Sequence, residues 1–173
     1  MSIAMAGCGT RAPVGNGPTS ATNDPALSAA ADALVPELEA RFKETYSGVV
    51  LKNADRTMVV YRKPDNALDE FVRARVQAVR VELSDSKISL ARMREIRDEV
   101  MREREQWSAN GIEVNGAGPR SDGSAVEVFT ARGAPEEQRA FDERYGEGTI
   151  SVVPEKPMDA TDPTLQTRVS PRG

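Results

Sequence analysis

The longest amphipathic pattern in this chain runs from Ser89 to Gly111. Its apolar residues recur at steps of three, four and seven, which places them on one face of a helix, and they are Met93, Ile96, Val100 and Trp107. Arginines and acids fill most of the positions between them, so the rest of the helix is predicted to face water. Gly111 suits the left-handed position after a helix, and Ile112 is placed to pack back on Trp107, as in a Schellman cap.

Short β-branched and alternating runs predict strands on both sides of this helix. The predicted strands cover 49–52, 57–62, 79–83, 112–114, 125–129 and 149–153, and two further helices are predicted after Pro64 and from Pro135. From Val79 onward the order is strand, helix, strand, strand, helix, strand. This order predicts an α+β fold of the ferredoxin-like, split βαβ type, with the earlier hairpin and helix extending the same sheet.

The remaining segments predict how the chain is divided. Residues 1–23 are rich in Gly, Pro, Ser and Thr and are predicted to be a flexible tether. Residues 24–45 have a helical pattern, predicted to bridge the tether and the domain, in which Pro36 either kinks one helix or starts a second. The folded domain is expected at 46–154, and residues 155–173, without periodicity, are predicted to form a disordered tail.

Composition removes several classes of function. The 173 residues contain no histidine, which is the commonest general base and imidazole ligand, and a single cysteine, which excludes a disulfide within the chain and a cysteine-cluster metal site. A net charge of −4 shows none of the excess basic charge typical of nucleic-acid-binding proteins. We therefore expect no nucleic-acid partner, no cofactor, no metal site and no catalytic residues. An enzyme that uses carboxylate or lysine chemistry is a further hypothesis, ranked below the two binding functions described at the end of this section.

Three local motifs have structural interpretations. Gly116-Ala117-Gly118 follows a strand, but no helix start follows it to bind phosphate, so a hairpin loop is favoured. Ser121-Asp122-Gly123 lacks the alternating acids of a calcium loop and is predicted to be a turn. The charges of the 89–111 helix are predicted to pair along it, for example Arg94 with Asp98, and to keep an exposed face soluble.

The N-terminal segment carries one candidate modification site. Met5-Ala6-Gly7-Cys8 resembles a bacterial lipobox, which implies that Cys8 becomes the first mature residue and carries lipid. Met5 stands where Leu is usual, and only seven residues precede Cys8, so this interpretation places the true start upstream of Met1. The alternative is an ordinary N-terminus with a chance cysteine. The first interpretation predicts a lipid anchor at the extracellular face of the cell membrane, and the second a cytoplasmic protein.

The pattern between residues 46 and 153 has a resemblance of its own. Tyr46-Ser47-Gly48-Val49-Val50-Leu51, Thr57-Met58-Val59-Val60 and the segments 79–81, 107–114 and 125–128 look like the N-terminal region of actinobacterial secreted trypsin-like proteases. These segments are similar to prosegments of the alpha-lytic protease and streptogrisin group, which assist folding of their protease and inhibit it. The resemblance implies an actinobacterial lipoprotein whose possible partner is a secreted serine protease.

Two functional hypotheses follow. The first is a non-catalytic, extracytoplasmic module that is anchored through Cys8 and binds or assembles with an unidentified partner. The second is a trans-acting inhibitor or folding helper of a trypsin-like protease. Neither hypothesis assigns a binding surface.

Overall fold

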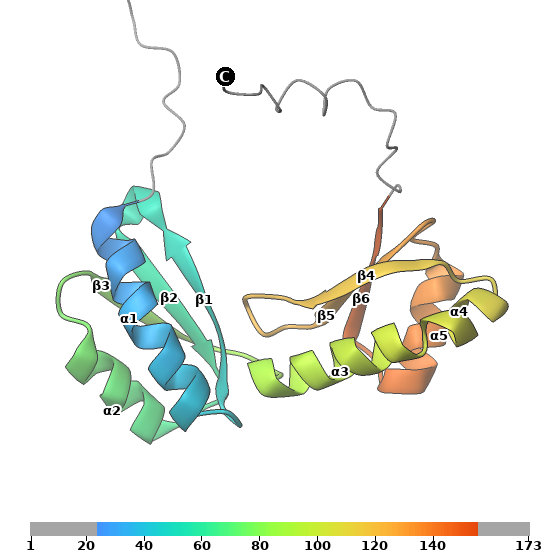
Figure 1. Cartoon of the computed structure of the whole chain (residues 1–173). Coiled ribbons are helices and arrows are strands. Elements are labelled where there is room, and N and C mark those ends of the chain that lie inside the picture. The colour runs from blue at the N-terminus through green and yellow to red at the C-terminus, as the bar shows by residue number, and fades with distance from the viewer. Residues whose placement is uncertain (1–23, 156–173) are drawn as a thin grey trace, which may run out of the picture.

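The structure, a computed structural model, describes residues 24–155, and these form two units with the same order of elements, helix–strand–strand–helix–strand (Figure 1). The first unit contains α1 (Pro25–Arg41), β1 (Tyr46–Lys52), β2 (Thr57–Arg62), α2 (Asn66–Arg75) and β3 (Arg80–Asp85), with a short 3₁₀ turn at Asn53–Asp55. The second contains α3 (Leu90–Arg102), α4 (Arg104–Ala109), β4 (Val114–Pro119), β5 (Val126–Thr130), α5 (Pro135–Tyr145) and β6 (Ile150–Pro154).

The strand pairing repeats as well. Each unit has its own three-stranded sheet, in the order β1-β2-β3 or β4-β5-β6, with the first pair antiparallel and the second parallel. Both hairpins shift register at the same place, between Tyr46 and Gly48 in one and between Val114 and Gly116 in the other. Two copies of one topology therefore make up the described part of the chain.

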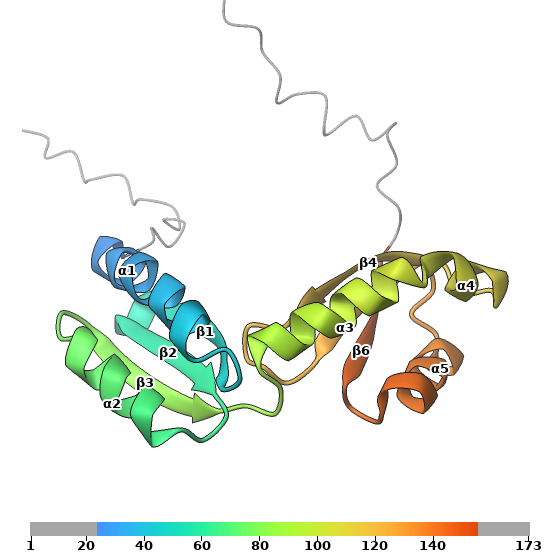
Figure 2. The same ribbon diagram turned by 60° about the horizontal axis from the view of Figure 1, so that its bottom comes forward.

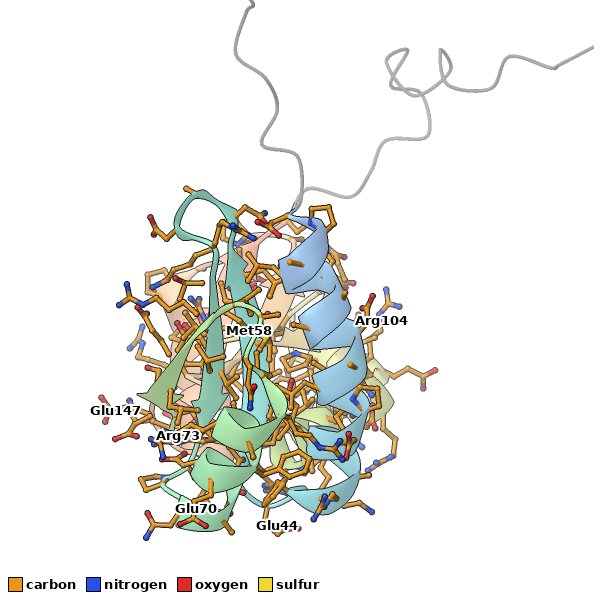
Figure 3. All side chains as sticks on the ribbon, turned by 90° about the vertical axis from the view of Figure 1, so that its left-hand side faces the viewer. Glu44, Met58, Glu70, Arg73, Arg104 and Glu147 are labelled. Atoms are coloured by element: carbon orange, nitrogen blue, oxygen red, sulfur yellow. The ribbon has the colours of Figure 1, made fainter. Side chains whose placement is uncertain are left out.

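Each unit packs its helices on one face of its sheet around a separate apolar core. In the first core, Leu27, Leu34 and Leu38 of α1 lie over β2 and α2. Figure 3 shows the first unit from its outer side, with Met58 of β2 near the centre and the exposed Glu70 and Arg73 of α2 toward the edge. The second core joins α3, α4, α5 and the sheet and contains Met93, Ile96, Val100, Trp107, Ile112, Val114, Val126, Val128, Phe141 and Ile150.

Local sequence explains most of the helix ends. The side chains of Asp24, Asp65 and Ser89 cap α1, α2 and α3 by accepting hydrogen bonds from first-turn N–H groups. Pro36 lies inside α1, which continues through it as one helix. At the end of α4, Gly111 adopts φ 78°, and the N–H groups of Gly111 and Ile112 donate to carbonyls of the last turn, so the expected Schellman cap is confirmed.

The α+β class is confirmed, but the arrangement of the strands differs from the expected single sheet. The strand at Arg80–Asp85 pairs in parallel with β2 and does not join β4, β5 and β6, so the split βαβ order does not describe the pairing. The reason is that α2 brings the chain back beside β2, where β3 completes the first unit. α1 also belongs to this unit, because its leucines are fully or almost fully buried in the first core.

Two predicted boundaries also change. The expected single helix over residues 89–111 breaks at Glu103, whose backbone ψ is 8° and whose carboxylate accepts hydrogen bonds from Arg144 and Tyr145 of α5. The hairpin loop expected at Gly116-Ala117-Gly118 is instead part of β4, which runs from Val114 to Pro119. β4 is an edge strand, where glycine and proline are tolerated since one side of the backbone needs no strand partner.

The two units are joined by a close backbone contact. The β4–β5 turn lies against the start of β1, and the Gly123 carbonyl accepts hydrogen bonds from the N–H groups of Lys87 and Ile88. A Cβ atom added to Gly48 would clash with the Ser121 carbonyl oxygen. Ser47 and Ser86 share a 2.6 Å hydroxyl hydrogen bond beside this contact. Only a glycine at position 48 permits this approach.

None of the helices between residues 24 and 155 combines the length and apolar character needed to cross a membrane. The predicted tether, Cys8 and the predicted tail from residue 156 onward lie outside the described residues.

Candidate functional site

A groove of about 260 Å³ lies between the two units. Figure 2 shows the backbone at this junction, where the C-terminal end of α1 lies near the N-terminal end of α3. The first unit supplies residues from α1, the following loop and the start of β1, and the second unit supplies one face of α3. The lining residues are Glu39, Lys43, Tyr46, Leu90, Ala91, Arg94, Glu95 and Asp98. Since each unit provides about half of the wall, the groove exists only while the units are docked.

Tyr46 borders the groove together with Leu90 and Ala91, and the half-buried Leu90 and Ala91 give it apolar surface. Only 3% of Tyr46 is exposed, and its backbone N–H donates to the Phe42 carbonyl, which holds the start of β1 against the end of α1. Burial, reinforced by the nearby Glu39 carboxylate, raises the pKa of the Tyr46 phenol to about 12. The phenol therefore stays protonated near neutral pH and is suited to packing and hydrogen bonding, not to acting as a base.

The rim of the groove is held by an ion pair between the units. The two terminal nitrogens of Arg94 donate to the two carboxylate oxygens of Glu39 at 2.8 and 3.0 Å. These hydrogen bonds raise the pKa of Arg94. A bidentate pair of this kind fixes the orientation of both side chains more firmly than a single contact. It thus sets the distance between α1 and α3 at the mouth of the groove.

This arrangement differs from the pairing predicted along the helix. Arg94 was expected to pair with Asp98, but it reaches across to α1, and Asp98 pairs instead with its neighbour Arg97 at 2.6 Å. Glu95 pairs with Arg92 at 2.9 Å, one turn away on the same helix. Periodicity along α3 gave no sign of the partner on α1, because that contact spans 55 residues.

The chemistry of the groove is that of a binding surface. It offers an apolar wall, a neutralised ion pair and a protonated phenol, which together suit an apolar or long aliphatic side chain with a polar end. Among residues 24–155, no group of three Asp or Glu side chains lies close enough together to hold a metal ion.

The structure places the other sequence motifs away from this groove. Gly116-Ala117-Gly118 is part of the edge strand β4 and not a loop. The 121–123 segment is a turn, as predicted: Asp122 accepts hydrogen bonds from the N–H and hydroxyl of Ser124, and Gly123 has φ 65°. Its contribution is to dock the two units, which sequence reasoning did not foresee.

Comparison of the chain with family models, with curated protein sequences and with solved structures finds no match.

Proposed function

We propose that this protein is a non-catalytic binding module, held at the extracellular face of the cell membrane by lipid on Cys8, and that a partner protein docks in the groove between α1 and α3. The observation that carries the binding part is the position of the half-buried Leu90 and Ala91 in a groove whose mouth is fixed by the Glu39–Arg94 pair. The anchoring part rests on the lipobox-like sequence before Cys8.

The position of the groove along α1 supports this combination. The tether joins the folded part at the N-terminal end of α1, whereas Glu39 lies near its C-terminal end. At 1.5 Å per residue, about 20 Å of helix separates Pro25 from Glu39. The groove therefore lies at the end of α1 that is farther from the proposed anchor, where a partner protein can approach it.

The charges around the groove are mostly paired with one another. Arg94 neutralises Glu39, and Arg92 and Arg97 pair with the rim acids Glu95 and Asp98, which leaves Lys43 as the lining cation without an ion pair among residues 24–155. The wall between these pairs is apolar, so it favours an aliphatic side chain of the partner. Such a side chain packs its methylene groups on the half-buried Leu90 and Ala91.

Site-specific photocrosslinking in native cells tests the binding part. A photoreactive residue at Lys43, in the full chain, is expected to give a discrete crosslinked species that is absent when the probe replaces the exposed Arg104 on α4. Ala91→Trp fills the groove and should abolish that species, whereas Ala109→Trp, the same change on an exposed part of α4, should leave it unchanged. Equal crosslinking in both tryptophan variants would contradict the proposal.

The anchoring part is tested separately by intact mass and fractionation. The native protein is expected in the membrane fraction, beginning at Cys8 and carrying added lipid mass, and Cys8→Ser should shift it to the soluble fraction. A soluble protein that still carries Met1 would overturn the anchor but would leave the groove experiment unaffected.

A further inference from the structure

We infer that a second depression at the junction of the units, on the other side of the start of α3, is a binding site for a small, multiply charged anion such as a phosphorylated compound. The depression has a volume of about 380 Å³, and its lining includes Glu44, Lys63, Lys87, Ser89, Arg92 and Thr149. It is distinct from the groove beside Tyr46.

Three cations from different parts of the fold meet there. Lys63 follows β2 in the first unit, Lys87 lies in the segment that connects the units, and Arg92 is in the first turn of α3. The single acid in the lining is Glu44, which lies at the lower end of the molecule in Figure 3. The site therefore carries a net positive charge in a protein whose own net charge is −4.

Neither of the two lysines has an acidic partner among residues 24–155. Most described arginines form ion pairs, whereas Lys63 and Lys87 form none with any residue between 24 and 155. Arg92 reaches only Glu95, which lies outside this depression. Cations that converge without counter-charges lower the cost of bringing an anion between them.

The start of α3 adds to the same field. Its first turn carries no acid, and its cap is the uncharged Ser89. The positive end of this 13-residue helix is therefore not offset by an acid within its own first turn, and its cap Ser89 and first-turn Arg92 line the depression with the lysines. The half-buried Thr149 supplies a hydroxyl from the second unit, so a bound anion contacts both units and the connection between them.

Isothermal titration of the full chain with pyrophosphate, against chloride at equal ionic strength, tests this inference. Saturable binding is expected, weakened about fivefold in Lys63→Gln and again in Lys87→Gln, because each change removes one contact-range charge. Arg104→Gln removes a cation outside the site that also has no ion pair among the described residues, and it should leave the affinity unchanged.

Glu44→Gln gives the opposite sign. Removing the one acid should tighten pyrophosphate binding about twofold to fivefold, an effect that loss of structure cannot produce. Cosedimentation with anionic and neutral vesicles distinguishes the two sources of the anion. If the anion is a lipid phosphate, the chain should bind anionic vesicles in a Lys63-dependent way. If it is a soluble compound, the chain should bind pyrophosphate but not the anionic vesicles. No saturable binding, or an equal loss in Arg104→Gln, would overturn the inference.

Discussion

The two units share one topology but stabilise it with different side chains. The first fills the centre of its core mainly with leucine, methionine and valine and has Tyr46 as its one buried aromatic residue, whereas the second packs Trp107 on Phe141, with ring centroids 4.3 Å apart. At the end of the middle strand, the first unit has Arg62 paired with Asp69 and Asp85, and the second has Thr130 donating to Glu137. The comparison shows that strand order and helix placement, not particular residues, are what the two halves have in common.

The largest expected difference between the units is in their cores. Val72 and Phe141 occupy the same position, seven residues after the caps Asp65 and Ala134, and both are fully buried. Phe141→Ala should lower the free energy of unfolding by about 4 kcal/mol and Val72→Ala by about 2 kcal/mol, because the ring leaves the larger cavity. Chemical denaturation of both variants measures the difference, and equal losses would show that the aromatic core has no special weight.

A smaller effect is expected at the two bulge glycines. Gly48→Ala places a methyl group against the Ser121 carbonyl and should cost about 3 kcal/mol, because backbone must move between the units. Gly116→Ala, the equivalent change in the second unit, meets only the Phe129 ring at 3.7 Å and should cost less than about 1 kcal/mol. Thermal unfolding of both variants tests the contact between Gly48 and Ser121. Equal losses of stability in the two variants would contradict it.

The strand-end carboxylates should give the fold an acid-sensitive stability. Hydrogen bonds from Arg62 hold the pKa of Asp69 below its ordinary 3.8. Burial raises the pKa of Glu137, but hydrogen bonds from Thr130, Ala134 and Arg132 outweigh it and keep that pKa below 4.5. Both groups bind protons more weakly when folded. Their contribution is therefore complete above the unfolded pKa values and is lost as pH falls through the folded ones.

Substitution at these two positions separates their contributions. Glu137 is 1% exposed, so Glu137→Gln should cost about 2 kcal/mol at neutral pH, because the amide nitrogen replaces one carboxylate oxygen and opposes the Arg132 donor, while the remaining oxygen still accepts from Thr130 and Ala134. Asp69→Asn should cost about 1 kcal/mol, since Arg62 keeps Asp85. Denaturation between pH 3 and 7 should show a shallower acid decline in each variant than in the native chain, and an unchanged decline would refute the assignment.

The smallest effect is expected at the helix caps. Asp65 caps α2 with its side chain, whereas Ala134, at the same place before α5, has no side-chain acceptor. Ala134→Ser should stabilise the second unit by about 0.5 to 1 kcal/mol, and Asp65→Ala should destabilise the first by about 1 kcal/mol. The urea midpoint should rise in Ala134→Ser and fall in Asp65→Ala, relative to the native chain. A lower midpoint in both variants would count against this prediction.

Local structure could be predicted from sequence, whereas the pairing of strands could not. Thr57–Arg62 and the α5 start at Pro135 agree with their predicted positions, because alternation and capping signals are contained within each segment. Which strand β3 joins depends on the crossover through α2, a non-local choice that the pattern leaves open. The same order of helices and strands is compatible with the ferredoxin-like pairing and with the pairing observed.

The repeat leaves a faint signal that sequence reasoning missed. Met58-Val59-Val60-Tyr61 and Val126-Glu127-Val128-Phe129 share an apolar, variable, valine, aromatic pattern, and both are preceded at the same distance by a bulge glycine. The helices obscure it, since α1 is rich in alanine and α3 in charge. The groove forms between the two units, so it could not be predicted while the repeat was missed. The resemblance to protease prosegments stays a prediction.

The most direct test of the proposed binding groove combines its position with the contact that assembles it. The crosslink expected from a photoreactive residue at Lys43 should persist in Gly116→Ala and disappear in Gly48→Ala, at a temperature where both variants are folded. This result follows if the partner needs α1 and α3 docked together. A crosslink of equal yield in Gly48→Ala would show that the partner binds one unit alone and would contradict the account.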